Sequence, residues 1–391
     1  MIRPEKLLSR KWPKPEHPPG EVNEEYSTER HREYFRPFVK EGSLTLRRLG
    51  RGGCGRVMPP GECAITALLA APGGEIFGAT SGTHAHLFAY DKSPDADVVI
   101  DLGRIGEEEY CTALAADGKG DIWGASTTGL FFRYPADSVT ASRHGHYKTQ
   151  IEIVGHVTEG EGVSCLVSDV KRNLLYALTS ETGTLKSIDL ATRKRETLSV
   201  VDRSGTYSRV LVISREGEVY GLRSRGEVYR FSSERGRIEG LDVRLPEENG
   251  RSLIAESMVL DRVREKIYIG TRGGMLFSFD LKTIRIERLG EASGKERIRT
   301  VTVGKDGRVF GVAGNPGGLG KLFVYEPDTR QLRTLGIPLA TVERFWHGYE
   351  FDASCTGRDG EIYLGESDRI SHLFIYHPPI ENSRESRVKT F

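Results

Sequence analysis

Short apolar runs separated by breaks rich in Gly and Asp follow one another along most of the chain. The pattern is clearest at residues 111–135, CTALAADGKGDIWGASTTGLFFRYP. Aliphatic and aromatic residues suit the half-buried surface of a sheet, and Gly and Asp supply the backbone freedom that tight turns need. The pattern therefore predicts three short β-strands, at 111–116, 121–125 and 130–135, joined by turns.

The centre of this stretch, an aliphatic residue followed by an aromatic one, recurs along the chain. The seven copies are Ile76-Phe77, Ile122-Trp123, Leu175-Tyr176, Val219-Tyr220, Ile267-Tyr268, Val309-Phe310 and Ile362-Tyr363. A third apolar run follows each copy, as in LFAYD at 87–91, and a fourth follows six of them, as in RIERLG at 285–290. Four strands repeated at intervals of 42 to 53 residues predict an all-β, seven-bladed β-propeller, in which each blade is covered by its neighbours.

The seventh unit lacks a fourth run, because Pro378-Pro379 and a charged tail follow its third. Residues 43–50, SLTLRRLG, resemble the fourth run QLRTLG at 331–336 and precede the first blade. We therefore expect 43–50 to be the outer strand of blade seven and to close the ring, which removes an open edge. This organisation predicts one propeller domain over 43–380, an arm over 1–42 and a charged tail over 381–391.

Five prolines within the first 19 residues predict an extended first half for the arm. Residues 23–39, NEEYSTERHREYFRPFV, carry Glu, Arg and aromatic residues at helical spacing and predict a short helix. Two interpretations remain open for this arm. It packs on the ring as a strap, or it contacts a protein partner or a second copy through Tyr26, Tyr34, Phe35 and Phe38.

Composition limits the classes of partner that the protein is expected to bind and the cellular compartment in which it is expected to work. Lys and Arg number 56 against 55 Asp and Glu, so no overall basic field predicts nucleic-acid binding. No run reaches the roughly 18 apolar residues that a membrane span needs, and the first 20 residues have no apolar core typical of a secretory signal. Cys111, Cys165 and Cys355 fall on expected inner strands, where thiols behave as small buried hydrophobes. We expect a cytoplasmic protein without nucleic-acid or membrane partners.

The up-and-down order of strands sorts the loops onto two rims of the ring. The turn rim receives the first-to-second and third-to-fourth connections, such as DGKG at 117–120 and KDG at 305–307. The His-rich rim receives the second-to-third and fourth-to-first connections. On it fall His84, His86, His156, His347 and His372, with Tyr110, Tyr207, Tyr349, Arg209, Arg344 and Trp346. Loops converge at this mouth of the channel, so we expect a ligand site there.

His86 and His372 precede the third runs of blades one and seven, which are neighbours in the ring. Their imidazoles are expected side by side, in a geometry suited to acid-base chemistry or to a divalent metal ion held by His84, His86 and His372. The alternative is that each histidine hydrogen-bonds a loop carbonyl and shapes its own turn.

Residues 344–349, RFWHGY, place an arginine, a tryptophan, a histidine and a tyrosine within six positions. Trp346 offers a flat face to a sugar ring, Arg344 a planar fork to a carboxylate, and His347 and Tyr349 offer exchangeable protons. With Trp346, the residues Arg209, Tyr110 and His156 complete the expected ligand-binding set. The alternative is an ordinary packed loop.

In arrangement, the repeats at 43–377 resemble the seven-bladed propeller lyases that cleave uronate-containing saccharides. The resemblance implies binding of an acidic saccharide and cleavage by β-elimination, with Arg or a metal neutralising the carboxylate and His and Tyr acting as base and acid. The rim residues that we expect to take these roles are His86, His372, His347, Tyr349, Arg344 and Tyr207. Two alternatives stay open: a non-catalytic propeller that holds a protein partner or other small polar ligand, and a metal-dependent hydrolase of the lactonase type. The second is disfavoured because no obvious set of carboxylates faces the channel from the inner strands.

Overall fold

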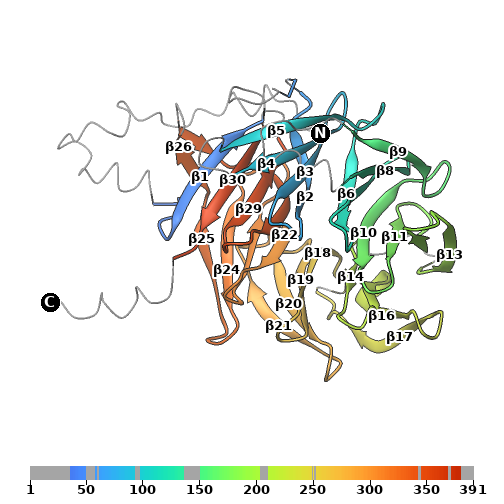
Figure 1. Cartoon of the computed structure of the whole chain (residues 1–391). Coiled ribbons are helices and arrows are strands. Elements are labelled where there is room, and N and C mark those ends of the chain that lie inside the picture. The colour runs from blue at the N-terminus through green and yellow to red at the C-terminus, as the bar shows by residue number, and fades with distance from the viewer. Residues whose placement is uncertain are drawn as a thin grey trace, which may run out of the picture.

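The computed structural model describes residues 36–49, 58–59, 61–92, 97–135, 150–202, 210–248, 250, 252–341, 345–368 and 371–379. Within these ranges the chain forms thirty strands and one turn of 3-10 helix, η2 (Ser224–Gly226). Seven four-stranded antiparallel sheets stand side by side around a ring (Figure 1). The predicted all-β, seven-bladed propeller is confirmed.

Blades one to six each contain four consecutive strands. They are β2 (Ala64–Ala70), β3 (Ile76–Ser81), β4 (His86–Asp91), β5 (Val98–Arg104); β6 (Cys111–Ala116), β7 (Ile122–Ser126), β8 (Leu130–Tyr134), β9 (Glu152–His156); β10 (Val163–Asp169), β11 (Leu174–Thr179), β12 (Thr184–Asp189), β13 (Arg195–Val200); β14 (Val212–Ile213), β15 (Val219–Leu222), β16 (Glu227–Ser232), β17 (Arg237–Arg244); β18 (Ala255–Asp261), β19 (Lys266–Thr271), β20 (Met275–Asp280), β21 (Arg285–Glu291); and β22 (Ile298–Val303), β23 (Val309–Ala313), β24 (Lys321–Glu326), β25 (Gln331–Gly336).

Blade seven takes three strands from the end of the chain and one from near its start. Its order is β1 (Ser43–Arg48), β30 (His372–His377), β29 (Ile362–Glu366) and β28 (Phe351–Thr356). β1 runs antiparallel to β30, with Ser43 opposite His377 and Arg48 opposite His372. The predicted closing strand is therefore confirmed.

Burial follows the position of each strand in its blade. The second strands are almost wholly buried, as in β7 and β29, whereas the fourth strands alternate between half-buried and exposed residues, as in β21. Because both faces of a blade are covered by other blades, the second and third strands read as continuous apolar runs. Cys111, Cys165 and Cys355 lie on the inner strands β6, β10 and β28 as free thiols, as expected.

An aromatic pair bridges six of the seven seams between blades. The aromatic residue of the repeated dipeptide packs on an aromatic residue in the third strand of the next blade, with ring centroids 5.7–6.2 Å apart. The pairs are Phe77–Tyr134, Tyr176–Phe231, Tyr220–Phe279, Tyr268–Tyr325, Phe310–Tyr376 and Tyr363–Tyr90. Between blades two and three, Trp123 instead stacks on Phe131 of its own blade, and Ile188 belongs to the same apolar cluster. The recurring dipeptide thus joins each blade to the next.

A second repeated device closes the hairpin between the second and third strands. In blades one, two, three and five, a hydroxyl at or near the end of the second strand accepts the backbone N–H that begins the third strand, at 2.8–3.1 Å. These hydroxyls belong to Thr80, Ser126, Thr179 and Thr271. In blade seven the equivalent residue is Glu366, whose carboxylate accepts the N–H of His372 at 3.2 Å.

The end of the predicted arm lies along blade six. Phe38 forms a parallel bridge with Ile337, and the Val39 N–H donates to the Ile337 carbonyl at 3.0 Å. Arg333 binds the Glu41 carboxylate at 2.7 and 2.8 Å. Residues 36–42 therefore tie blade six to the closing strand. Residues 36–39 are not helical, and residues 1–35 of the arm and the tail at 381–391 lie outside the described residues.

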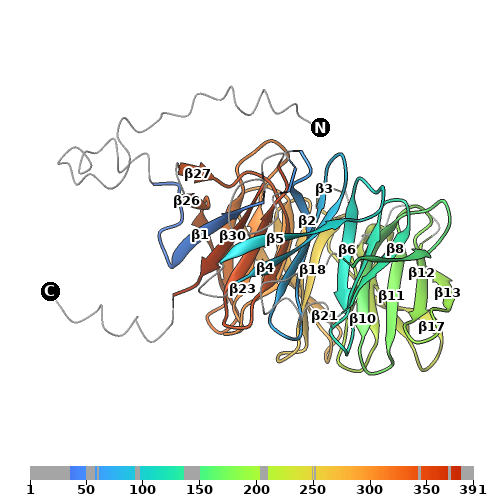
Figure 2. The same ribbon diagram turned by 45° about the horizontal axis from the view of Figure 1, so that its top comes forward.

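A small hairpin of β26 (Leu339–Thr341) and β27 (Phe345–His347) lies between blades six and seven (Figure 2). Among the residues that the structure describes, no helix is long and apolar enough to cross a membrane.

Candidate functional site

The strands that line the channel carry a β-bulge near the His-rich rim. In every blade except blade four, the register between first and second strands shifts by one residue at the same place. The bulged residues are Thr66, Thr112, Ser164, Glu256, Arg299 and Asp352. A bulged residue leaves the ladder and is re-aimed, which is why bulges gather at functional sites. The bulges define a ring of side chains at the mouth of the channel.

The bulged residues of blades one, two and three, Thr66, Thr112 and Ser164, are neutral, and their hydroxyls donate to backbone carbonyls. Thr66 donates to the Cys111 carbonyl at 2.5 Å, and Thr112 donates to the Val163 carbonyl at 2.6 Å. Each of these two hydroxyls therefore ties its blade to the first residue of the next inner strand. The rest of the ring, in blades five, six and seven, is charged, because its bulged residues are Glu256, Arg299 and Asp352. We call these three residues the charged arc.

Glu256 holds two arginines in place. Its carboxylate accepts Arg272 Nε at 2.6 Å, and Arg297 Nε and Nη2 at 2.7 and 2.8 Å. The side chain of Glu256 is buried, whereas that of Arg272 is mostly exposed. Bidentate binding fixes the plane of the Arg297 guanidinium beside Arg299.

Arg299 is the centre of the charged arc. Its guanidinium donates to Asp352, and its side chain is 28% exposed. Burial lowers the pKa of Arg299, and the neighbouring charge of Arg297 lowers it further. Burial raises the pKa of Tyr110, and the charge of Arg299 opposes this shift. Because Tyr110 leads into blade two and Arg299 belongs to blade six, the two side chains approach each other across the channel mouth.

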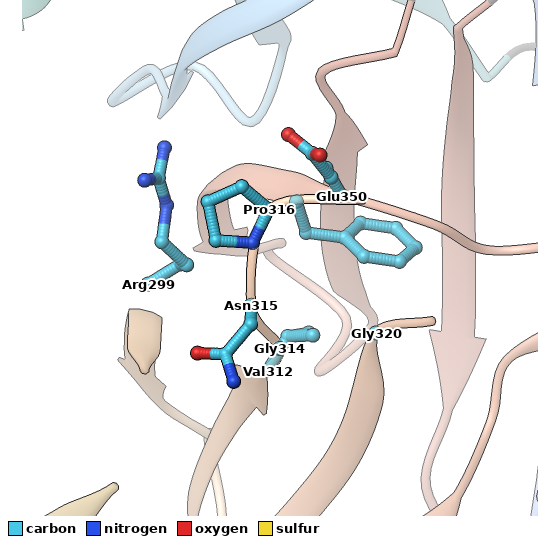
Figure 3. Close-up of a pocket in the computed structure, with 8 residues that line it drawn as sticks. Arg299, Val312, Gly314, Asn315, Pro316, Gly320 and Glu350 are labelled. Atoms are coloured by element: carbon cyan, nitrogen blue, oxygen red, sulfur yellow. The ribbon is translucent and has the colours of Figure 1, made fainter. Parts of the chain in front are cut away.

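A pocket opens beside Arg299 (Figure 3). It is a small, partly open hollow lined by Arg299, Val312, Gly314, Asn315, Pro316, Gly320, Glu350 and Phe351. The Arg299 guanidinium and the Glu350 carboxylate point to the same side of the pocket, with Pro316 between them. Glu350 also accepts the Gly317 N–H. The pocket therefore presents a cation, an anion and an apolar wall within one opening.

His84 and His86 are engaged by carboxylates in blade one. His86 Nε2 lies 2.7 Å from a Glu62 carboxylate oxygen and His86 Nδ1 lies 2.9 Å from Asp101, so a carboxylate faces each ring nitrogen. Burial lowers the pKa of His86, but the hydrogen bonds with Asp101 and Glu62 outweigh it and raise the pKa overall. His84 Nδ1 contacts the other oxygen of Glu62 at 2.7 Å. Both histidines thus bind carboxylates rather than the loop carbonyls of the alternative interpretation.

His372 has a different carboxylate partner, Glu366. Its Nδ1 lies 2.9 Å from Glu366, and the Trp346 ring lies 4.2 Å from the imidazole. Glu366 is fully buried and also accepts the Trp346 Nε1–H at 3.1 Å and the Tyr349 backbone N–H at 3.1 Å. Burial raises the pKa of Glu366 and lowers that of His372 to about 4. The two predicted partners, His86 and His372, therefore sit in separate hydrogen-bonded clusters.

The remaining predicted site residues are spread over several places. His347 stacks on Phe38 with centroids 5.2 Å apart, and burial lowers its pKa. His156 is exposed at the end of the outer strand β9. Arg344, Tyr207 and Arg209 lie outside the described residues. Among the predicted residues that the structure describes, Tyr110 is the one whose charge state is coupled to Arg299 of the charged arc.

Within the described ranges, no group of three or more His, Cys, Asp or Glu side chains is arranged to hold a metal ion. The divalent metal at His84, His86 and His372 stays a prediction.

The sequence showed no obvious set of carboxylates facing the channel from the inner strands, whereas the structure has two bulged carboxylates there, Glu256 on β18 and Asp352 on β28. Arg299 was also missed. A signal existed in the sequence: each of the three stands where blades one to three carry Thr66, Thr112 and Ser164. A charged residue at a position otherwise held by hydroxyls marks the arc once the repeats are aligned.

No protein-family model matches the sequence, and no curated protein matches it significantly. Solved structures do match. A streptogramin B lyase is 10% identical, with 85% of this chain and 97% of that chain covered at a TM-score of 0.65. Virginiamycin B lyase from Staphylococcus aureus is 8% identical, with 87% and 100% covered at a TM-score of 0.66.

The extracellular domain of the one-component system BT4673 from B. thetaiotaomicron is 15% identical, with a TM-score of 0.61. The match covers 86% of this chain but only 40% of that one, so the chain spans less than half of its length. At these identities the likeness supports the propeller fold alone. Lyases and the extracellular domain of a one-component system share this fold, so the function has to be argued from the site.

Proposed function

We propose that the protein binds a carboxylate-bearing saccharide at the channel mouth of the His-rich rim, with Arg299 contacting the carboxylate. The observation that carries the proposal is the position of Arg299, which lines the pocket, is partly desolvated and lies beside a second arginine. Asp352 is its hydrogen-bonded partner. A guanidinium has five N–H donors in a planar fork, so donors remain for an incoming carboxylate.

The rest of the pocket supports a sugar as the body of the ligand. Pro316 offers exposed apolar surface to the face of a ring, and Asn315 and Glu350 offer hydrogen-bonding groups to its hydroxyls. Sites for small molecules combine an apolar lining with a few polar groups in this way. A simple inorganic anion would use Arg299 but not this wall.

Cleavage by β-elimination is the second part of the proposal. It needs an acid and a base near the carbon beside the carboxylate. Tyr110 and Glu350 lie at the mouth and carry groups that can exchange protons, and unlike Glu256 and Asp352 neither is bound to an arginine of the charged arc's network, whereas His372 is buried against Glu366. We therefore transfer the acid-base roles from the histidines to Tyr110 and Glu350. Binding without cleavage corresponds to the non-catalytic alternative.

The test compares an oligogalacturonate with its methyl ester, which keeps the sugar and removes the charge. Calorimetric titration should give binding of the acid and little binding of the ester. Arg299→Ala should weaken binding roughly 10- to 100-fold, because a charge-assisted hydrogen bond contributes about 1.5–3 kcal/mol. Arg272→Ala removes a mostly exposed arginine from the same network and is the matched control.

Equal affinity for acid and ester, or unchanged affinity of Arg299→Ala, would contradict the proposed site. Formation of an unsaturated uronate, followed by its ultraviolet absorbance, tests cleavage separately. Binding with no such product would leave the site intact and remove the elimination chemistry.

A further inference from the structure

Carboxylates dominate one half of the His-rich rim. Four connections of blades one to three, residues 105–110, 127–129, 157–162 and 180–183, contain six Glu and no Lys or Arg. Two of the six are engaged within the fold: Glu108 accepts the Thr128 hydroxyl, and Glu161 is buried. The other four are exposed, and we call them the acidic arc: Glu107, Glu109, Glu159 and Glu181.

The neighbouring residues do not restore the balance of charge. Glu62, His84 and Asp202 are the titratable groups of the adjoining described connections, and two of these three are carboxylates. Arg104, at the end of β5, lies 3.6 Å from Glu62. Among ion pairs between described residues, the acidic arc takes part in one, in which Glu107 lies 3.9 Å from His84 Nε2. The acidic arc is therefore not neutralised by lysine or arginine in the described part of the chain.

The rest of the rim differs in this respect. The described connections on the His-rich rim of blades four to seven carry five Lys or Arg and five Asp or Glu. These residues are Arg223, Arg225, Arg272, Lys295 and Arg297 against Glu247, Glu248, Glu296, Glu350 and Asp368. The negative excess thus belongs to blades one to three, whereas the blades around Arg299 are balanced.

Hydrogen bonds hold the connections that carry the acidic arc. The Glu108 and Glu109 carbonyls accept backbone N–H groups of the blade-one connection 82–85 at 2.6 and 3.0 Å. The buried Glu161 carboxylate accepts the N–H groups of Glu181 and Thr182 at 3.0 and 2.6 Å. The repulsive charges are therefore fixed in place before a ligand arrives.

The acidic arc lies across the channel mouth from the proposed carboxylate site. Tyr110 directly follows Glu109 and is within electrostatic reach of Arg299 in blade six. A saccharide that places its carboxylate on Arg299 and extends over the mouth therefore directs its next sugar towards blades one to three. The charge of that sugar meets the negative field of the acidic arc.

We infer that the acidic arc restricts the ligand to a single carboxylate, so that the uronate at Arg299 is followed by a neutral or cationic sugar. This inference rests on the proposed function and narrows its substrate class. Like charges brought together at a binding site oppose association, and such repulsion is a common source of specificity. A polyuronate can still bind through Arg299, but more weakly than a saccharide with one uronate.

The experiment compares three disaccharides by calorimetric titration with the full chain. Each has galacturonate as one sugar, and the second sugar is galacturonate, galactose or galactosamine. Affinity should rise in this order by roughly three- to tenfold at each step in low salt, because each step removes a negative charge or adds a positive one. The steps should shrink as salt is raised, since the acidic arc is exposed.

The acidic-arc variant Glu107→Gln, Glu109→Gln, Glu159→Gln should bind the three disaccharides with affinities within about twofold of one another. The matched control is Glu196→Gln, Glu216→Gln, Glu234→Gln. It removes three exposed carboxylates that lie outside the His-rich rim, so it changes net charge equally and should keep the order of affinities. Circular dichroism establishes that both variants fold.

Equal affinity of the wild-type protein for the three disaccharides would overturn the inference, and so would an unchanged order of affinities in the folded acidic-arc variant. Loss of the order in both variants would show that only net charge matters and would overturn it as well. Failure of the proposed function looks different. In that case no disaccharide binds, or Arg299→Ala binds all three as well as the wild type does, and the inference falls with the site.

Discussion

The aromatic pair that closes the ring, Tyr363 with Tyr90, predicts a measurable coupling between the two ends of the propeller. Tyr363 is 1% exposed and Tyr90 6%, and their ring centroids lie 5.8 Å apart at an angle of 57°. Aromatic pairs in tilted geometry contribute about 0.5–1.5 kcal/mol beyond the area that they bury. Truncation of a buried aromatic residue to Ala costs about 3–5 kcal/mol, which combines lost burial with an empty cavity.

The perturbation that isolates the pair is a double-mutant cycle with leucine, which keeps apolar volume and removes the rings. Tyr363→Leu and Tyr90→Leu should each lower the free energy of unfolding, and the double variant should lose about 1 kcal/mol less than their sum. Urea denaturation followed by fluorescence gives the three free energies from midpoints and slopes. Tyr325→Leu combined with Tyr363→Leu is the control, because these rings belong to different seams and their effects should add.

Coupling near zero for Tyr363 and Tyr90, equal to that of the control, would refute the reasoning. The recurring aromatic residue would then act only through burial.

Three further outcomes follow from the closing region. Glu366→Ala should lower the free energy of unfolding by roughly 3 kcal/mol or more, because the Trp346 indole and the Tyr349 amide lose their acceptor. Glu366→Gln keeps an acceptor and should lower it by about 1 kcal/mol; urea denaturation measures both. Since burial lowers the pKa of His372 to about 4, its neutral form stabilises the fold, and that stability is lost as pH falls from 6.5 through 4. Melting temperatures of His372→Gln should therefore fall less over this interval than those of wild type; an equal fall would contradict the assignment. Deleting residues 1–48 should yield aggregates on size-exclusion chromatography, because β30 loses its partner, whereas deleting 1–35 keeps β1 and should yield the same peak as the full chain.

The fold could be predicted because each blade repeats the same local signals. The dipeptides such as Ile122-Trp123 place one buried strand per unit, and Gly and Asp mark the turns between strands. The closing strand was readable because SLTLRRLG at 43–50 repeats the pattern of the outer strands. What a single repeat hides is register: a bulge shifts the alternation of side chains by one residue, so Arg299 is distinguished from a solvent-facing residue of an ordinary strand only when the repeats are aligned.

The His-rich rim shows why residue type alone did not place the site. Its histidines were grouped by rim, but burial and carboxylate partners decide what each one can do. His86 is enclosed by Glu62 and Asp101, and His372 by Glu366, and none of these pairings has a fixed sequence spacing. Tyr110 lies beside the charged arc because it immediately precedes an inner strand. A residue's position next to a bulge, rather than its ability to titrate, indicated whether it lies at the candidate site.

The pairing of β1 with β30 also orders events during synthesis on the ribosome. Ser43 must wait for His377, which at about 5–20 residues per second emerges roughly 15–70 s later. During that interval the nascent chain holds an unpaired strand at each end of a growing arc of blades. Only a chain translated through β30 can complete blade seven, so ring closure distinguishes finished chains from truncated ones without any other factor. Truncated products keep exposed strand edges, and chaperones and proteases would recognise these products by those edges.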